Sequence, residues 1–381
     1  MSKATPARTW FGRRIRASIL PLVVVSLVYG VFVSLYELDS TRLPWKLWRT
    51  DDPYLYEEIH PRFLKTDPAA LITIGSSEDA RTTRQALVDA IWGPDGFPAF
   101  KQPARLDSDV QVDGFTDLPN LDRINRLHAQ VDADYTAFAD IYRARDSGNR
   151  LVLLHDGHGD DGTYGNLKVH IGLLLKQGID VVTFSLPGYN GNAMGVRYLP
   201  RYGWYAIHPW RSLDLLDRPM RLWIEPVVIA VNHATASGSY ESIDMMGFSA
   251  GGWATMVAAA VDPRIRRSYP VAGAYPLYLR SGEEAKQSPR PQYFAPLIRA
   301  GNYLEMFVLA ALGEDRAQVQ VFNRYDRCCY NNRKGELYEP AVAAAVAAAG
   351  GGRFAVLVDE SHPRHKVSAW AMARIIDDIL R

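Results

Sequence analysis

Short apolar runs alternate with helical segments from Asp122 to the C-terminus, and few folds accommodate such an order. Apolar runs of about four to eight residues separated by helices are typical of a mostly parallel sheet covered by helices on both faces. The first runs, 124–131 and 136–142, follow one another directly and are expected to form a hairpin about Asp132 and Asp134. The pattern therefore predicts an α/β fold whose sheet begins antiparallel and continues parallel.

The other expected elements follow in a simple order. A helical stretch at 215–234 contains Pro219 and Pro226, which are expected to interrupt it because proline has no amide hydrogen to donate. The remaining strands are expected at 151–154, 181–185, 242–246, 268–272, 319–322 and 354–358, and the helices at 81–92, 167–176, 251–261, 337–348 and 367–380.

A glycine-rich turn separates one of these strands from its helix. Residues 247–251 (GFSAG) fit the G-x-S-x-G pattern, and Gly252 follows. In such a turn the glycines let strand and helix approach closely, and the strained serine exposes its hydroxyl. Ser249 is therefore the predicted nucleophile, and the backbone amide of Ala250, at the helix start, is a predicted oxyanion donor. The alternative is a small-residue turn that only packs the strand against the helix.

A second glycine loop, residues 155–159 (HDGHG), directly follows the strand at 151–154. In a fold of this kind such a loop supplies the other oxyanion donor, and the backbone amides of Gly157 and His158 are both candidates. A purely structural turn is one alternative. The other is a metal site built on His155 and His158, but the spacing departs from that of metallo-β-lactamase-like hydrolases. No metal or other cofactor is expected.

The acid and the base of a catalytic triad are expected late in the chain. Asp326 follows the strand that ends near residue 323 and is the preferred acid, because a carboxylate that orients an imidazole must be held rigidly. Asp359 is a weaker rival. His362 and His365 both precede the last helix, and His365 is the preferred base because Pro363 restricts the backbone of His362.

Cys328 and Cys329, the only cysteines, are adjacent and close to Asp326. Their adjacency excludes a disulfide framework and a zinc site built on spaced cysteine pairs. We expect small buried side chains beside the acid loop, with a vicinal disulfide as the alternative outside the cytoplasm.

Over residues 122–381 these segments resemble the α/β-hydrolase superfamily. The resemblance rests on the GFSAGG turn, the HDGHG loop, residues 185–189 (SLPGY) and the late aspartate and histidine. The chain is also similar to bacterial, membrane-anchored members that carry a GHG loop and a Tyr-Asp-x-Cys-Cys segment, here residues 325–329. This resemblance implies a serine esterase mechanism without naming the ester.

The N-terminal part predicts a membrane anchor. Residues 18–36 carry no charge and would span about 28 Å as a helix, close to the hydrocarbon thickness of a bilayer. Basic residues dominate 1–17, so the N-terminus is expected in the cytoplasm and the hydrolase outside it, in the periplasm of a bacterium. A cleaved signal peptide or a buried helix fits less well. Residues 37–121 form an extension without an assigned role.

The partner expected from sequence is an ester-bearing small molecule, lipid or glycan. A net charge of +1 gives no electrostatic case for nucleic acid. Residues 189–210 are dense in tyrosine and tryptophan, which suits sugar or acyl-chain binding and equally suits a cap over the core. A lid is expected within 276–311, although 307–311 could equally be a packing helix. Acyl transfer by the same triad and a non-catalytic anchored scaffold remain the alternatives to ester hydrolysis.

Overall fold

The computed structural model describes residues 24–31, 54, 58–132, 135–158, 166–189, 191–192, 194–207, 212, 215–280 and 290–381. The chain divides into two compact units, Met1–Leu55 and Tyr56–Arg381. In the first unit residues 24–31, within the predicted anchor 18–36, are helical. The other residues of that anchor, 18–23 and 32–36, lie outside the described residues. Of the helices in the described ranges, none combines the length and the apolar character needed to cross a bilayer.

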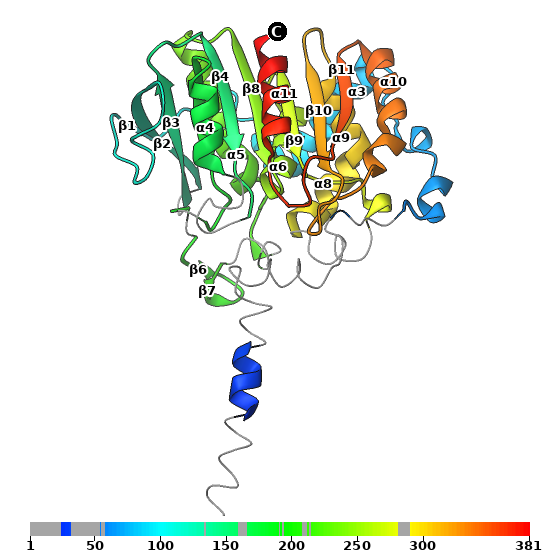
Figure 1. Cartoon of the computed structure of the whole chain (residues 1–381), viewed down its shortest axis with the longest axis horizontal. Coiled ribbons are helices and arrows are strands. Elements are labelled where there is room, and N and C mark those ends of the chain that lie inside the picture. Colours follow the sequence, from blue (N-terminus) through cyan, green and yellow to red (C-terminus); the bar gives the residue numbers. More distant parts are fainter. Residues whose placement is uncertain are drawn as a thin grey trace, which may run out of the picture. The chain divides into compact units, whose positions relative to one another are not determined.

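One sheet runs through the second unit, in the order β1-β2-β3-β5-β4-β8-β9-β10-β11 (Figure 1). The pairs β1·β2, β2·β3 and β3·β5 are antiparallel. All the following pairs in this order, from β5·β4 to β10·β11, are parallel, as the sequence pattern predicts. The strands are β1 Arg105–Asp107, β2 Leu121–Asp132, β3 Tyr135–Ala144, β4 Arg150–His155, β5 Ile179–Phe184, β8 Ser242–Phe248, β9 Arg267–Val271, β10 Ala317–Asn323 and β11 Arg353–Asp359.

Helices cover both faces of this sheet. Helices α4 and α11 pack on one face, in front of the strands in Figure 1, and the others pack on the opposite face. Parallel strands are buried on both faces for this reason, so every residue of β8 and β10 is buried. The helices are α3 Ser77–Trp92, α4 Leu167–Leu175, α5 Arg221–Ser237, α6 Ala250–Val261, α8 Ala295–Ala300, α9 Tyr303–Ala311, α10 Glu339–Ala349 and α11 Ala369–Leu380.

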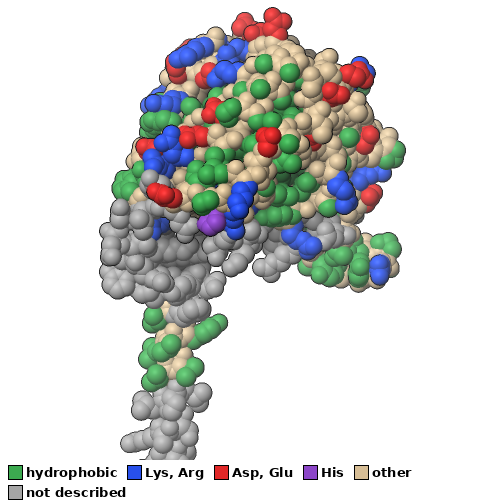
Figure 2. Space-filling view, turned by 90° about the vertical axis from the view of Figure 1, so that its right-hand side faces the viewer, with side chains coloured by type: hydrophobic (Ala, Val, Ile, Leu, Met, Phe, Trp, Pro, Cys, Tyr) green, Lys and Arg blue, Asp and Glu red, His purple; other side chains and the backbone are tan. Residues whose placement is uncertain are grey.

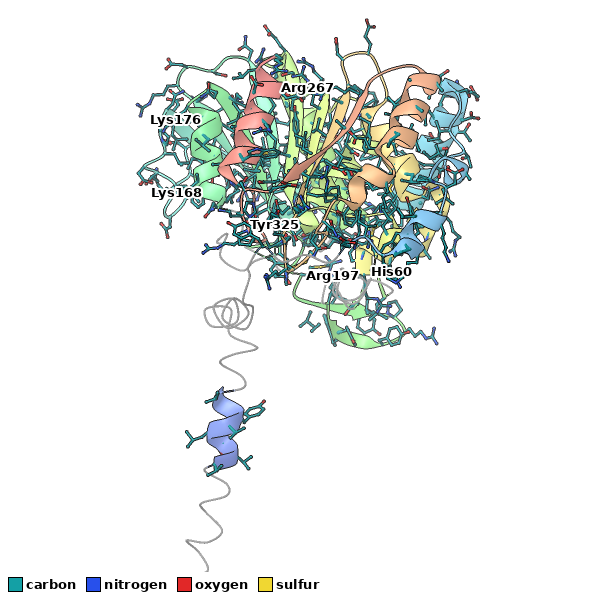
Figure 3. The ribbon with its side chains drawn as sticks, turned by 45° about the vertical axis from the view of Figure 1, so that its right-hand side comes forward. His60, Lys168, Lys176, Arg197, Arg267 and Tyr325 are labelled. Atoms are coloured by element: carbon teal, nitrogen blue, oxygen red, sulfur yellow. A yellow bond between two sulfur atoms is a disulfide. The ribbon has the colours of Figure 1, made fainter. Side chains whose placement is uncertain are left out.

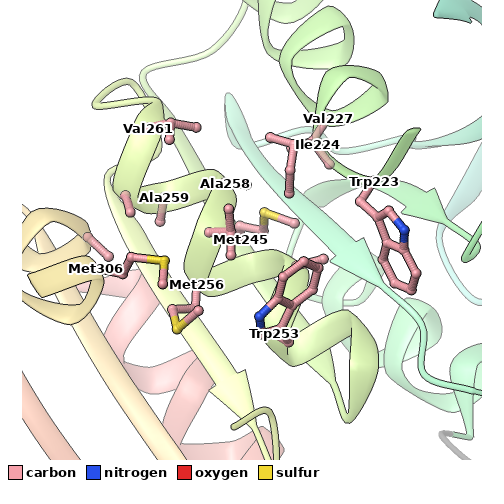
Figure 4. Close-up of a cluster of buried hydrophobic side chains, with 14 of the residues drawn as sticks. Trp223, Ile224, Val227, Met245, Trp253, Met256, Ala258, Ala259, Val261 and Met306 are labelled. Atoms are coloured by element: carbon pink, nitrogen blue, oxygen red, sulfur yellow. The ribbon is translucent and has the colours of Figure 1, made fainter. Parts of the chain in front are cut away.

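Helix α6 lies at the centre of the larger hydrophobic core. All of its residues are buried, and its many alanines and glycines let α5, α9 and the sheet approach it closely. Figure 4 shows Trp253 of α6 toward Trp223 of α5, with ring centroids 5.5 Å apart, while Met256 lies on the side of Met306 from α9. Burying each of these large side chains contributes roughly 1.5–3 kcal/mol, and together they hold the start of α6 in place.

Two expectations from the sequence need correction. Residues 56–121 of the predicted extension belong to the second unit, because α3 packs on the same core and β1 pairs with β2, whereas residues 37–55 fall in the first unit. Pro226 does not interrupt the long helix: α5 begins after Pro219 and continues through Pro226, since burial of its apolar residues offsets the missing hydrogen bond.

The aromatic segment after β5 forms a small separate hairpin, β6 (Val196–Leu199) with β7 (Gly203–Ala206). Its base is held by Arg197, which is buried and lies 3.6 Å from Asp132. Figure 3 labels Arg197 at the same edge of the unit as Tyr325, which follows β10. The hairpin therefore stands at the edge where β5, β8 and β10 end.

Candidate active site

Ser249 occupies a sharp turn between β8 and α6. Its φ of 55° and ψ of −119° lie outside the common regions for a side-chain-bearing residue. Its amide donates to Val271 O of the neighbouring strand at 2.8 Å, which ties the turn to the sheet. A Cβ on Gly251 would lie 2.3 Å from the carbonyl oxygens of His155 and Asp156, so only glycine allows α6 to approach β4 this closely. The predicted nucleophile therefore has the strained geometry of a nucleophile elbow.

The loop after β4 lies against this turn. Strands β4 and β8 are adjacent and parallel, with His155 opposite Gly247. An ideal Cβ on Gly157 would lie 3.2 Å from Ser249 Cβ. The loop is therefore beside the nucleophile, as expected of a segment that supplies an oxyanion donor.

The candidate oxyanion donors differ in their surroundings. The Ala250 amide is in the first turn of α6, where helical amides have no carbonyl partner within the helix. The Gly157 amide donates to Asp156 Oδ1 at 2.8 Å. His158 is exposed, and its Nε2 lies 2.8 Å from the hydroxyl of Tyr189, a contact that the sequence analysis did not anticipate.

His155 is buried and His158 is exposed, so the two imidazoles lie in different surroundings. His155 is buried against Phe184, with Nδ1 3.0 Å from Asp156 O, and burial lowers its pKa to about 4. Within the described part of the chain, the grouping of three side chains that could share a metal consists of Cys328, Cys329 and His365.

Asp326 and His365 meet at the edge where β10 and β11 end. The two strands are parallel and adjacent, so the loops that follow them lie side by side. His365 Nδ1 is 2.5 Å from Asp326 Oδ2, and the Asp326 side chain is completely buried. The His365 ring packs on Phe248, the residue before Ser249, with centroids 4.5 Å apart. The sheet order therefore brings the predicted acid and base together, beside the residue that precedes the predicted nucleophile.

The rival residues form a second pair in the same loop. His362 Nε2 lies 3.3 Å from Asp359 Oδ2, and His362 Nδ1 accepts a hydrogen bond from the Arg364 amide at 3.1 Å. The Ser368 hydroxyl, which also caps α11, donates to Asp359. Burial alone would raise the pKa of Asp359, but the hydrogen bonds from His362, Ser361 and Ser368 outweigh it and hold that pKa well below its usual value.

The cysteine pair contributes to the acid's surroundings in a way that the sequence analysis missed. Cys328 and Cys329 are joined in a vicinal disulfide, the alternative to the small buried thiols expected. Their backbone amides both donate to Asp326 Oδ1, at 2.8 and 3.3 Å. The signal in the sequence was the spacing, because amides two and three residues after an aspartate are well placed to reach its carboxylate.

Comparison with known proteins supports the fold. No protein-family model matches the chain, and no curated protein matches it. Several solved structures, however, are similar to it in fold. The methylesterase BT1017 is 17% identical with a TM-score of 0.59, over 81% of this chain and 64% of that one. A glucuronoyl esterase from Solibacter usitatus is 12% identical with a TM-score of 0.56, over 83% of this chain and 97% of that one.

Acetyl xylan esterase 1 from Thermoanaerobacterium sp. JW/SL YS485 is 14% identical with a TM-score of 0.53, over 82% of this chain and 96% of that one. This chain thus spans less than two thirds of the methylesterase and nearly all of the other two. These likenesses confirm the α/β-hydrolase fold predicted from the sequence.

Proposed function

We propose that this α/β-hydrolase-fold chain is a serine esterase that cleaves carboxylic esters through an acyl-enzyme on Ser249. The observation that carries the proposal is the 2.5 Å contact between Asp326 and His365, set beside the strained turn of Ser249. Each component alone has a structural explanation. Their convergence from the ends of β8, β10 and β11 is what nucleophilic catalysis requires.

In the proposed mechanism His365 takes the Ser249 proton as the oxygen attacks the ester carbonyl. Asp326, which accepts from His365 Nδ1, holds the imidazole in the tautomer that leaves Nε2 as the base and stabilises the imidazolium that forms. The Ala250 amide and an amide of the 157–158 loop donate to the oxyanion. His365 then protonates the leaving alcohol, and water releases the acyl group by the same steps in reverse.

The substrate class that we propose is an acylated or esterified glycan, with envelope lipid as the alternative ester. The three similar structures are named for esters of carbohydrates or for methyl esters, which supports this class. The β6–β7 hairpin supports it too. Its cross-strand pair Tyr198 and Trp204 is 61% and 75% exposed, and aromatic rings of this kind stack on sugars.

The distribution of charge on the molecular surface does not favour a charged polymer as the partner. On the described residues of the face drawn in Figure 2, lysine and arginine are interspersed with aspartate and glutamate. Together with the net charge of +1, this supports an uncharged ester partner over nucleic acid.

The direct test replaces the nucleophile. Ser249→Ala is expected to lower kcat on p-nitrophenyl acetate by about a thousandfold or more and to abolish labelling by a fluorophosphonate probe, because no covalent step remains. Ser237→Ala is the matched control: its hydroxyl donates to Ala234 O and accepts from the Ser239 amide, both local contacts at the end of α5, so its rate should equal that of the wild type. A folded Ser249→Ala variant that is still labelled would overturn the assignment.

A further inference from the structure

The vicinal disulfide lies in direct contact with the catalytic acid. Cys328 and Cys329 are half-buried and follow Asp326 in the loop after β10. Their sulfur atoms and a ring nitrogen of His365 all lie within 4.8 Å of one another. Their two amides donate to Asp326 Oδ1, while Oδ2 accepts from His365. One oxygen of the carboxylate therefore faces the disulfide turn and the other faces the base.

The disulfide restricts the backbone that presents these amides. A bond between adjacent cysteines closes a small ring that includes the peptide bond joining them, so neither residue can rotate freely about its backbone dihedrals. The turn continues with Tyr330 at φ 53° and Asn332 at φ 75°, a conformation that side-chain-bearing residues seldom adopt unaided. Breaking the sulfur–sulfur bond would therefore release the part of the turn that holds Asp326.

The same bond should matter little for global stability. A disulfide stabilises a fold mainly by closing a chain loop, and its effect grows with the length of that loop. Adjacent cysteines close the shortest loop there is. The position of this disulfide is thus suited to a local effect on the acid and poorly suited to a general effect on folding.

We propose that the Cys328–Cys329 disulfide is a reducible positioning element for the catalytic acid, so that a thiol reductant lowers the esterase rate. The step is a thiol–disulfide exchange: a dithiol passes two electrons and two protons to the cysteine pair, the sulfur–sulfur bond becomes two thiols, and the dithiol becomes a cyclic disulfide. The inference rests on the proposed function. Asp326 remains the catalytic group, and the cysteines act through it.

The test uses the purified full chain in oxidised, reduced and re-oxidised form. Dithiothreitol is removed under nitrogen before the assay, because thiols themselves cleave activated esters, and alkylation followed by mass spectrometry counts the thiols. On p-nitrophenyl acetate, reduction should lower kcat by about tenfold to a hundredfold, the range for a small displacement of a catalytic group, with KM within about twofold. Re-oxidation should restore kcat, and the melting temperature should change little.

Two features of the chain sharpen the experiment. It has only these two cysteines, so an effect of the reductant cannot arise from another thiol. The double variant Cys328→Ser/Cys329→Ser is the matched control, expected to have the kcat of the reduced wild type and no response to dithiothreitol. Its melting temperature separates a local loss from unfolding.

The possible results separate this inference from the proposed function. An oxidised wild type that neither hydrolyses the ester nor reacts with the fluorophosphonate would overturn the proposed function and this inference with it. A wild type that hydrolyses the ester equally well with the disulfide and with two alkylatable thiols would overturn the inference alone. So would two thiols in the chain as purified in air, or a loss of rate that follows unfolding.

Discussion

The last loop before α11 carries two histidines, and each of them pairs with a different carboxylate. Asp326 pairs with His365, whose ring packs beside the nucleophile turn. Asp359 pairs with His362 and with the hydroxyl of Ser368, which caps the helix. The first pair lies beside Phe248, the neighbour of the predicted nucleophile, whereas the second ties the loop that carries His365 to β11 and α11. Replacing His365 should therefore lower ester hydrolysis much more than replacing His362.

His365→Ala is expected to remove nearly all ester hydrolysis, because without a base the serine hydroxyl is a weak nucleophile at neutral pH. His362→Ala should lower kcat/KM by about tenfold to a hundredfold at most, through disturbed packing of the loop. The measurement is kcat/KM for both variants on one activated ester, with circular dichroism to show that each is folded. A nearly inactive His362 variant beside an active His365 variant would reverse the two roles.

Among the secondary-structure elements, the start of α6 depends most on small residues. Gly251 lies against the carbonyls of His155 and Asp156, and Gly252 against Gly273. These contacts set how closely the helix, the β4 loop and the loop after β9 approach one another. The distance between the predicted nucleophile and the candidate oxyanion donors of the 157–158 loop therefore depends on the glycines themselves.

Gly251→Ala is accordingly expected to lower the free energy of unfolding by about 1–3 kcal/mol and the esterase rate by more than about tenfold, because α6 must move away from β4. Gly75→Ala is the control. The nearest atom to its added Cβ would be Asp79 Oδ2 at 3.8 Å, so its unfolding free energy should stay within about 0.5 kcal/mol of the wild type. Urea unfolding measures both, and equal stability of the two variants would contradict this account of the elbow.

Helix α9 shows whether its part of the 276–311 segment is a lid or a packing helix. All of its residues are buried, and Asn302 and Glu305 form a capping box at its start. A lid must expose the site and so cannot consist of a fully buried helix. Residues 303–311 are therefore a packing helix, the alternative given for 307–311, and residues 281–289 of the same segment lie outside the described residues.

At the scale of the whole molecule, the boundary between the two units leads to a test by truncation. A chain that begins at Tyr56 should fold and hydrolyse esters as the full chain does, because it keeps the whole second unit. A chain that begins at Asp122 should aggregate. It lacks α3, and the buried Glu225 loses its contacts with Trp92 and Lys101. The measurements are the solubility, circular dichroism and ester hydrolysis of the two chains. If the chain that begins at Asp122 is folded and active, the domain boundary predicted from the sequence at Asp122 is correct after all.

The orientation in a membrane remains a prediction of the basic residues in 1–17 and the apolar run 18–36. A reporter enzyme that works only outside the cytoplasm, fused after Arg381, should be active in a bacterial host. Replacing the arginines of 1–17 with glutamine should reduce that activity. A full-length fusion that is produced but inactive would refute the orientation.

The order of strands and helices could be predicted from the sequence, because apolar periodicity is a local property and this fold translates it directly into buried faces. The turn at Ser249 could be predicted as well, since its glycines reflect a close approach of strand and helix that leaves no room for a Cβ. The assignment of α3 to the second unit could not, because packing across more than a hundred residues leaves no local pattern. Strand β1 has only three residues, too few to show a strand pattern.

The same limit applied to the candidate site. The spacing of His362, Pro363 and His365 favoured one base, but only the parallel register of β10 and β11 brings Asp326 within hydrogen-bonding distance of His365 and leaves His362 to Asp359. The Cys328–Cys329 bond likewise appeared only as an alternative, since its contact with the acid depends on how the loop after β10 turns. Residue types and their order therefore determined which chemical groups this chain offers, and tertiary structure decided which of them meet, because a site depends on distances between residues that are remote in sequence.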